Sequence, residues 1–503
     1  MVTINASSKK LFEIDAEAYA YTLLEGFAFS KQLKEISTQF FPDLEKLMKK
    51  SGFTGKKEDI LIVPLVLNDK IAHCFFVGIG AKEDREITME HYRRILGQLV
   101  KQVVKHHCRT LALQLPSNTF FSLTTEELAD QTTSILMMAT YQFTDYITDK
   151  ERKKVKLDEI VLRSEEKNKK AVGEGIKIGQ IVGTAVNKAR HLIDLPPSMV
   201  TPQYFAEKAK EVAKKYGLKV TIFEKKQIEE FGMGGLLAVA QGSDIGPRLV
   251  ILEYQPKKKT APTLAFVGKG VTFDSGGLSL KTPIHMETMK EDMSGAAAVF
   301  ASMQALAQLK PSVHVVGIMP LAENLPDSKS VKPGDIVQFY NGKTAEIKNT
   351  DAEGRLILAD ALAYAVKQYK PDAIIDIATL TGACAYSLGP FYSGLFSQHD
   401  DLVNQISQAA SYSGDKVWRL PMGEDYKKAI QSSVADICNI GSKKIMAGAT
   451  TAAHFLQHFV ADVPWVHLDI AGTAFNVPDI SYYREGATGV GVRLLIELAM
   501  HWQ

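Results

Sequence analysis

The chain has 503 residues, enough for at least two domains and a substantial hydrophobic core. Its 59 Lys and Arg nearly balance its 57 Asp and Glu, and the net charge of +2 indicates no polyanionic partner. Hydrophobic residues make up 46% and charged residues 23%, as is usual for globular proteins, and no apolar run reaches the roughly 20 residues of a membrane span.

The four cysteines lie far apart in the sequence and form no CxxC pair. This spacing is typical of reduced thiols in an intracellular protein. The first ten residues contain no apolar core of a signal peptide. We therefore expect a cytoplasmic protein with no membrane partner.

Short strands and helices alternate in the first 165 residues, and no cluster of acids or histidines there indicates catalysis. We predict a small α/β domain over residues 1–165. Its expected strands are residues 59–66, 73–78, 110–114 and 156–162, and its expected helices are residues 90–107 and 125–144.

A charged run at residues 164–170 leads into a long helical pattern, which we interpret as a linker helix over residues 166–195. Pro196 and Pro197 end this helix, because proline cannot continue a helical hydrogen-bond pattern. Thr201 followed by Pro202 is typical of the start of the next helix.

The same alternation continues over residues 196–503, which we predict to be a larger catalytic domain. Alternating strands and helices favour a mostly parallel sheet with helices on both faces. The expected strands are residues 219–223, 248–253, 264–268, 313–319, 373–378 and 466–470, and the expected helices are residues 295–309 and 356–367.

Ionisable residues lie between the expected strand 264–268 and the expected helix 295–309. Lys269 and Asp274 follow the strand among glycines, which allow a turn that brings the two side chains together. Asp292 lies immediately before the helix, which is rich in small residues. Strand ends are where open α/β sheets hold their ligands.

The eight residues 349–356, Asn-Thr-Asp-Ala-Glu-Gly-Arg-Leu, join a short strand to a buried helix. In an extended segment Asp351 and Glu353 point the same way and can converge on one point. Two carboxylates that close repel each other unless a cation lies between them. Oxygen ligands suit Mg, Mn or Zn, so we predict a two-metal pocket. The alternative is an Asx turn with Glu353 and Arg355 as a solvated pair.

The octapeptide closely resembles the signature of the leucyl aminopeptidase (cytosol aminopeptidase) family, as do VGKGVTFDSGG at residues 267–277, Lys281, and MKEDMSGAA at residues 289–297. The similarity covers roughly residues 170–500. It implies a macro-like N-terminal domain and a di-metal peptidase that removes N-terminal residues from peptides.

The resemblance also implies roles for individual residues. A pair of divalent ions is held by residues matching Lys269, Asp274, Asp292, Asp351 and Glu353. Lys281 and Arg355 match catalytic positions, with Arg355 beside a bicarbonate, and the subunits form a homohexamer. An apolar pocket near Met289 and residues 379–382 would favour leucine-like side chains.

Several alternatives remain. Ser275 is expected not to be a serine-protease nucleophile, because that chemistry needs a histidine base and a two-barrel β fold. His454 and His458 have zinc-ligand spacing but aromatic neighbours, which favour packing. Some bacterial members of the family bind DNA, but this chain has no basic stripe to support that function. Asp194 replaces the asparagine usual in the family, and residues 441–448 replace a more glycine-rich loop.

Overall fold

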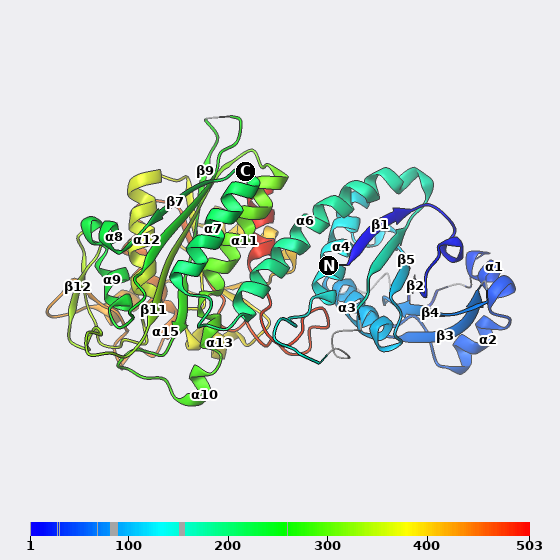
Figure 1. Ribbon diagram of the computed structural model, residues 1–503, viewed down its shortest axis with the longest axis horizontal. Helices are drawn as coiled ribbons and strands as arrows, with labels where there is room; N and C mark the ends of the chain where they lie inside the picture. The colour runs from blue at the N-terminus through cyan, green and yellow to red at the C-terminus, as the bar shows by residue number, and fades with distance from the viewer. Residues whose placement is uncertain are drawn as a thin grey trace. The chain divides into compact units, whose positions relative to one another are not determined.

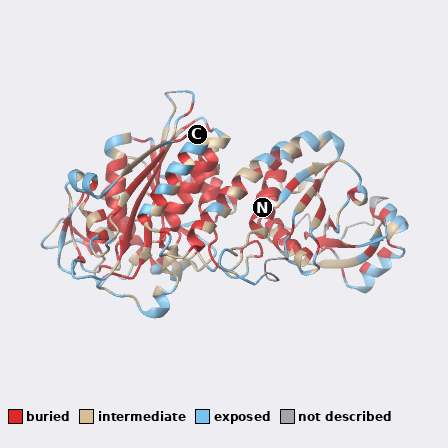
Figure 2. Ribbon diagram, in the orientation of Figure 1, coloured by how far each residue is buried: buried red, intermediate tan, exposed pale blue. Residues whose placement is uncertain are grey.

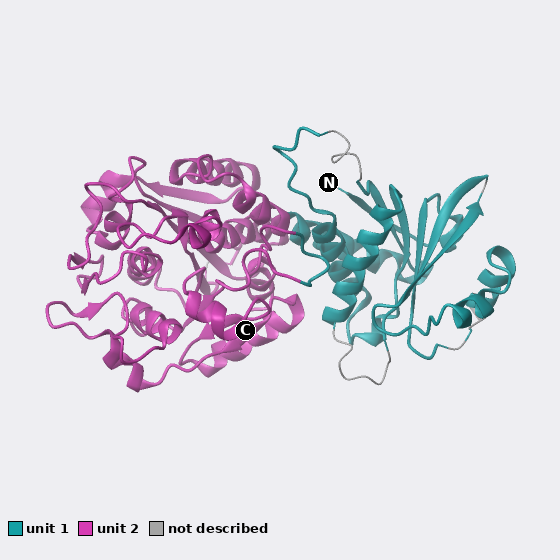
Figure 3. Ribbon diagram, turned by 90° about the horizontal axis from the view of Figure 1, so that it is seen from below, with its two compact units in different colours: residues 1–184, 479–484 teal, residues 185–478, 485–503 magenta. Residues whose placement is uncertain are grey.

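The computed structural model describes residues 2–27, 29, 31–67, 69–80, 89–149, 156–258 and 260–503 (Figure 1). The chain divides into two compact units, Met1–Thr184 with Asp479–Arg484, and Ala185–Pro478 with Glu485–Gln503 (Figure 3). The boundary falls within the long helix α6 (Lys169–Asp194). The sequence-based boundaries at residues 165 and 195 stay predictions.

The first unit contains, among its described residues, a six-stranded sheet in the order β1-β6-β5-β2-β4-β3. Neighbouring strands are parallel except β3 and β4, which are antiparallel. One apolar cluster of this unit includes alternate residues of β2 and β4. The strands are β1 (Thr3–Ser7), β2 (Ala18–Leu23), β3 (Ile60–Leu67), β4 (Lys70–Gly78), β5 (Thr110–Gln114) and β6 (Glu159–Arg163).

Helix α4 begins at a capping motif. Thr124 and Glu127 form a reciprocal capping box at the start of α4, which satisfies two backbone N–H groups. The segment Asp479–Arg484 belongs to this unit and packs on α3, where Tyr482 donates a hydrogen bond to Glu90. The helices are α1 (Lys31–Phe40), α2 (Leu44–Lys50), α3 (Met89–Lys105) and α4 (Thr125–Thr140).

The second unit is built on a nine-stranded sheet of the described residues, in the order β16-β15-β18-β14-β9-β11-β8-β7 with β10 paired to β11. The central strands β18, β14, β9 and β11 are parallel, and β15 and β8 run antiparallel to their inner neighbours. The strands are β7 (Lys219–Phe223), β8 (Arg248–Tyr254), β9 (Thr263–Gly268), β10 (Gly270–Asp274), β11 (His314–Asn324), β14 (Ala373–Ala378), β15 (Ser393–Phe396), β16 (Val417–Arg419) and β18 (Trp465–Asp469).

Helices cover both faces of this sheet, which explains why its central strands are buried along their whole length (Figure 2). α7, α11, α14 and α16 pack together in one layer, and α8, α9, α12, α13 and α15 pack together in the other. The helices are α7 (Pro202–Tyr216), α8 (Lys225–Phe231), α9 (Gly234–Ala240), α10 (Pro283–Met286), α11 (Ser294–Leu309), α12 (Gly354–Tyr369), α13 (Gly382–Leu388), α14 (Asp400–Ser413), α15 (Gly448–Gln457) and α16 (Val492–Met500).

The predicted fold class is confirmed: the chain has two α/β units, and the larger has a mostly parallel sheet covered by helices. Thr201 caps α7 through the backbone N–H of Tyr204, as the Thr-Pro pair predicted. A small sheet combines β12 (Ile336–Gln338) and β13 (Thr344–Glu346), which precede α12, with β17 (Ile437–Cys438), which follows it in the chain. Among the described helices, none combines the length and apolarity needed to cross a membrane.

Candidate metal centre

The predicted site residues come from four segments that meet where the central parallel strands end. Asp274 is the last residue of β10. Asp292 lies in the short 3-10 helix Met289–Met293, directly before α11. Lys269 connects β9 to β10, and Thr379 follows β14. This placement follows the general rule that ligands bind at the carboxyl ends of parallel strands.

The octapeptide forms a turn, which corrects the expectation of an extended segment. The side chain of Asn349 accepts a hydrogen bond from the backbone N–H of Asp351, and its carbonyl accepts one from Ala352. Glu353 already has helical dihedral angles, with φ −80° and ψ −37°, and caps α12. The Asx turn weighed as the alternative is therefore present, but Glu353 and Arg355 are both buried and not a solvated pair.

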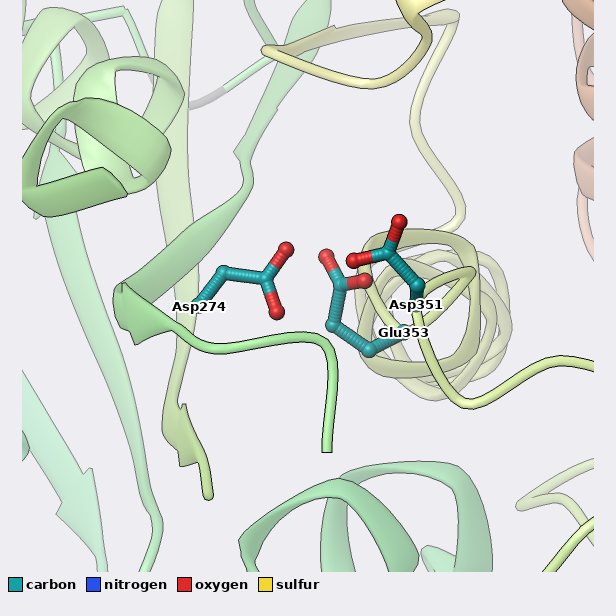
Figure 4. Close-up of side chains that lie close together, drawn as sticks. All are labelled: Asp274, Asp351 and Glu353. Atoms are coloured by element: carbon teal, nitrogen blue, oxygen red, sulfur yellow. The ribbon is translucent and has the colours of Figure 1, made fainter. Parts of the chain in front are cut away.

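Three carboxylates converge at this turn (Figure 4). Asp274, Asp351 and Glu353 each offer a ligand oxygen, and these oxygens all lie within 4.8 Å of one another. They come from two segments separated by more than seventy residues, and the fold therefore brings them together. Such an array of oxygen donors is suited to a hard divalent cation.

Lys269 lies at the buried side of the cluster. Its Nζ is 2.6 Å from Asp292 Oδ1 and 2.9 Å from Glu353 Oε1, and it donates to the carbonyl of Thr379 at 2.7 Å. A Cβ on Gly354 would lie 2.4 Å from Lys269 Cε. Position 354 is thus a glycine because any side chain there would overlap the side chain of Lys269.

Lys281 lies at the more open side of the cluster. Its Nζ is 2.6 Å from Asp351 Oδ1 and 2.9 Å from Asp274 Oδ2. The side chains of Lys281 and Asp351 are 15% and 31% exposed, whereas that of Lys269 is 3% exposed. A substrate approaching from solvent therefore meets Lys281 and Asp351 first.

Asp292 is held through one oxygen only. Its Oδ1 accepts hydrogen bonds from Lys269 and from the hydroxyl of Thr379 at 2.8 Å. Its buried Oδ2 has no hydrogen-bond partner within the part of the chain that the structure describes. A buried carboxylate oxygen without a donor is costly unless a cation neutralises it, so this residue fits a metal ligand.

The pKa values of Asp274, Asp292 and Asp351 are raised, whereas attraction to Lys269 and Lys281 outweighs burial and lowers the pKa of Glu353. Burial, with repulsion from Glu353, raises the pKa of Asp274 to about 6. Burial also raises the pKa of Asp292, and the nearby ammonium of Lys269 does not offset this rise. The pKa values of Lys269 and Lys281 are raised, because attraction to the carboxylates outweighs the effect of burial. A divalent cation would supply positive charge to the carboxylates whose pKa is raised.

Arg355 is buried in the first turn of α12, and its Nη1 donates to the carbonyl of Asn439 at 2.7 Å. Its Nε has no partner among the described residues. Burial lowers the pKa of this guanidinium to about 10, so it stays charged at neutral pH. A planar cation with an unused donor is suited to a small planar anion.

Several residues that hold the site together were not predicted from the sequence. Asn439 accepts hydrogen bonds from the backbone of Lys348 and Asn349 and donates to the carbonyl of Asn349. Asn324 donates to Asp274 and to the carbonyl of Thr350. These residues stand outside the charged motifs, and their contacts depend on strand register, which the sequence pattern did not reveal.

The weaker candidates have structural roles. Ser275 donates its hydroxyl to the carbonyl of Asn324, with no histidine in that hydrogen bond. His454 is buried and stacks against Tyr426, with ring centroids 6.4 Å apart. Asp194 accepts a hydrogen bond from the backbone of Ala487, and its carbonyl accepts one from Lys290.

Two family models match the chain. The catalytic domain of the cytosol aminopeptidase family matches residues 187–496, and the N-terminal domain of the same family matches residues 23–150. Together these matches cover most of both structural units.

Curated relatives match over nearly the whole length. A probable cytosol aminopeptidase of Aquifex aeolicus is 39% identical over 496 residues, and the match covers 98% of this chain and 98% of that protein. A probable cytosol aminopeptidase of Chlorobium limicola is 46% identical over 370 residues, and the match covers 72% of this chain and 73% of that protein.

Solved structures agree with these matches. A mutant of tomato leucine aminopeptidase superposes with a TM-score of 0.87 at 31% identity, covering 99% of this chain and 96% of that one. The bottromycin maturation enzyme BotP in complex with Mn gives a TM-score of 0.84 at 32% identity, covering 96% of this chain and 99% of that one.

Proposed function

Because the chain belongs to the cytosol aminopeptidase family, it is a metallo-aminopeptidase, and we propose that it uses two divalent ions per chain to remove N-terminal residues from peptides. The observation that carries this proposal is the convergence of Asp274, Asp351 and Glu353 within 4.8 Å. The unpartnered Oδ2 of buried Asp292 supports a second ion, which Asp292 would help to hold.

We assign the ions to five residues of this chain: Lys269, Asp274, Asp292, Asp351 and Glu353. Bound divalent ions supply a Lewis acid and an activated water for hydrolysis. The oxygen-rich ligand set suits Mn, Zn or Mg, and Mn is the metal in the BotP complex. Lys269 can contribute a nitrogen only as the free amine, so its proton must leave when a metal binds.

The remaining charged residues act on the substrate. Lys281 keeps its ammonium form, because Asp274 and the other carboxylates hold its pKa above the usual range. It donates a hydrogen bond to the scissile carbonyl oxygen as negative charge develops there. The unused Nε donor of Arg355 would hold a bicarbonate, which would supply a base for hydrolysis.

We also propose the substrate range and the assembly. Met289 and residues 379–382 line an apolar pocket, which favours peptides with an N-terminal leucine-like residue. The active protein is a homohexamer. It lies in the cytoplasm, a location that the word cytosol in the names of its relatives supports.

The test is a comparison of leucine amide with N-acetyl-leucine amide at the same pH and metal concentration. We expect hydrolysis of leucine amide alone, because acetylation removes the basic lone pair of the amine and adds bulk. A dipeptide with an N-terminal glutamate serves as the control for side-chain preference. Comparable rates for the free and the acetylated amide would refute the aminopeptidase assignment for this site.

A further inference from the structure

Asn324 occupies the last position of β11, between the two segments that carry the candidate ligands. It is 2% exposed. Its Nδ2 donates to Asp274 Oδ1 at 2.8 Å and to the carbonyl of Thr350 at 3.0 Å. The backbone carbonyl of Asn324 accepts hydrogen bonds from the backbone N–H and the hydroxyl of Ser275, at 3.0 and 2.7 Å.

The orientation of the Asn324 amide follows from its neighbours. Asp274 Oδ1 and the carbonyl of Thr350 are both acceptors, so only the NH₂ group can face them. The opposite side of the amide is closed by Gly277, where a Cβ would lie 2.8 Å from Asn324 Oδ1. Both amide hydrogens are thus committed to the two ligand-bearing segments.

The two carboxylate oxygens of Asp274 have different partners. Oδ1 accepts hydrogen bonds from Asn324 and from the backbone N–H of Gly276, each at 2.8 Å. Oδ2 receives neither of these bonds and lies 2.9 Å from Lys281 Nζ, among the charged groups of the cluster. The N–H donors therefore fix the carboxylate plane and leave Oδ2 to face a cation.

We infer that Asn324 is a positioning residue that makes Asp274 a one-oxygen metal ligand and ties the Asp351 turn to it through the carbonyl of Thr350, an inference that rests on the proposed metal centre. Partners behind a metal ligand fix its orientation, and their loss typically lowers metal affinity by about 10–100-fold. Without Asn324, the Asp274 carboxylate is free to rotate, and the turn at residues 349–353 loses its link to β10.

The test measures Mn²⁺ binding to the metal-free protein by the electron paramagnetic resonance signal of free Mn²⁺. Asn324→Leu keeps the approximate shape of the side chain and removes the amide hydrogens without adding charge. We expect one of two Mn²⁺ dissociation constants to rise by about 10–100-fold. The other dissociation constant should change by less than about threefold, because Asp292 and Lys269 do not contact Asn324.

Asn118→Leu is the matched control, since its Nδ2 donates to a backbone carbonyl, that of Leu123, in the first unit. Its Mn²⁺ affinities should equal those of the wild type. Guanidinium unfolding of each metal-free variant separates folding from binding. If Asn324→Leu does not fold, Asn324→Ala provides the same measurement.

The outcomes are distinguishable. A wild-type protein that binds fewer than two Mn²⁺ ions per chain would overturn the di-metal proposal itself. A wild type that binds two ions, together with a folded Asn324 variant of unchanged affinity and reduced stability, would show a purely structural role and overturn the present inference alone.

Discussion

Lys269 and Lys281 each bridge two carboxylates of the same cluster, yet their surroundings differ. Lys269 is enclosed by Asp292, Glu353 and the carbonyl of Thr379. Lys281 lies beside Asp351, which is the more exposed part of the cluster. Lys269 is too enclosed to contact a substrate and can contact only a bound metal, whereas Lys281 can also contact a substrate. This difference in access is the structural reason for assigning them different roles.

Replacing Lys281 tests the role of the open lysine. Lys281→Ala should lower kcat by about 10²–10³-fold, because one preorganised donor to the developing oxyanion is lost. Metal content, measured by elemental analysis, should fall much less. Lys427→Ala, which breaks an ion pair with Glu424 elsewhere on the second unit, is the control and should keep full activity. A loss of metal equal to the loss of turnover would identify Lys281 as a ligand.

Replacing Asp351 tests the metal centre itself. Asp351→Asn removes one anionic ligand from a turn and not from the core, so the fold should persist while metal pairing and activity are lost. Circular dichroism and elemental analysis of the same sample measure both effects. Asp327→Asn, an exposed loop carboxylate that accepts a hydrogen bond from Lys329, should change neither. Full metal occupancy with normal turnover in Asp351→Asn would contradict the assignment.

Lys269 and the four carboxylates were predictable from their positions between strands and helices, whereas Lys281 and Arg355 were predicted only through the resemblance to the aminopeptidase family. The geometry that brings them together was not predictable. Asp351 and Glu353 converge through a turn anchored by Asn349, whereas alternation along a strand was expected. Neutral residues such as Asn324 and Thr379 carry no motif, and their roles depend on which strands lie side by side.

At the scale of elements, β14 and β18 share a buried polar group in the middle of the sheet. Asp376 and His467 are directly opposed across the strand pair. His467 Nδ1 lies 2.6 Å from Asp376 Oδ1, and Trp465 Nε1 donates to Asp376 Oδ2 at 2.6 Å. Burial alone would lower the pKa of His467, but the charge of Asp376 outweighs burial and raises it.

This raised pKa predicts a pH-dependent contribution to stability. A histidine with a raised folded-state pKa stabilises the protein fully below its unfolded pKa of about 6.5, and the contribution disappears as pH rises through the folded value. The difference in unfolding free energy between wild type and His467→Gln should therefore be largest near pH 6 and shrink at higher pH. His501→Gln, at an exposed histidine, is the control. A pH-independent difference would mean that His467 is neutral.

The contact of α3 with the segment Asp479–Arg484 provides a second test at this scale. A Cβ on Gly97 would lie 2.4 Å from the backbone nitrogen of Tyr482. Gly97→Ala should destabilise the first unit by about 1–3 kcal/mol, because overpacking outweighs the gain in helix propensity of about 1 kcal/mol. Gly173→Ala in α6, where a Cβ meets nothing within 4 Å, should instead be neutral or stabilising. Thermal unfolding of both variants gives the comparison, and equal behaviour would contradict the predicted clash.

Strands with a clear run of apolar or β-branched residues were predicted most accurately. β5, β7 and β14 match their expected ranges, although β7 lies at the edge of its sheet and contains no buried residue. The buried strand β2 was not predicted. The short strands β15, β16 and β17 were not predicted, since two to four residues carry too little pattern. α4 ends at Thr140 and not at residue 144, because Tyr141 adopts an extended conformation although the apolar residues continue.

At the scale of the whole molecule, the surface of the second unit carries large apolar side chains that the fold does not cover. Tyr386 on α13 is 86% exposed and Trp418 on β16 is 60% exposed. The rings of Tyr392 and Trp418 pack edge to face at 6.0 Å. Exposed aromatic side chains of this kind are typical of surfaces that contact other proteins. The net charge of +2 presents no electrostatic barrier to self-association.

The proposed hexamer gives the final prediction. Light scattering at micromolar concentration should report a mass six times the 55.4 kDa of one chain. Because apolar burial would hold the subunits together, the mass should persist from low to moderate salt, whereas assembly through exposed ion pairs would weaken as salt rises. Dilution to nanomolar concentration, followed by crosslinking, shows whether smaller assemblies appear. A mass of 55.4 kDa at micromolar concentration would rule out the hexamer and leave the exposed aromatic residues without a partner copy.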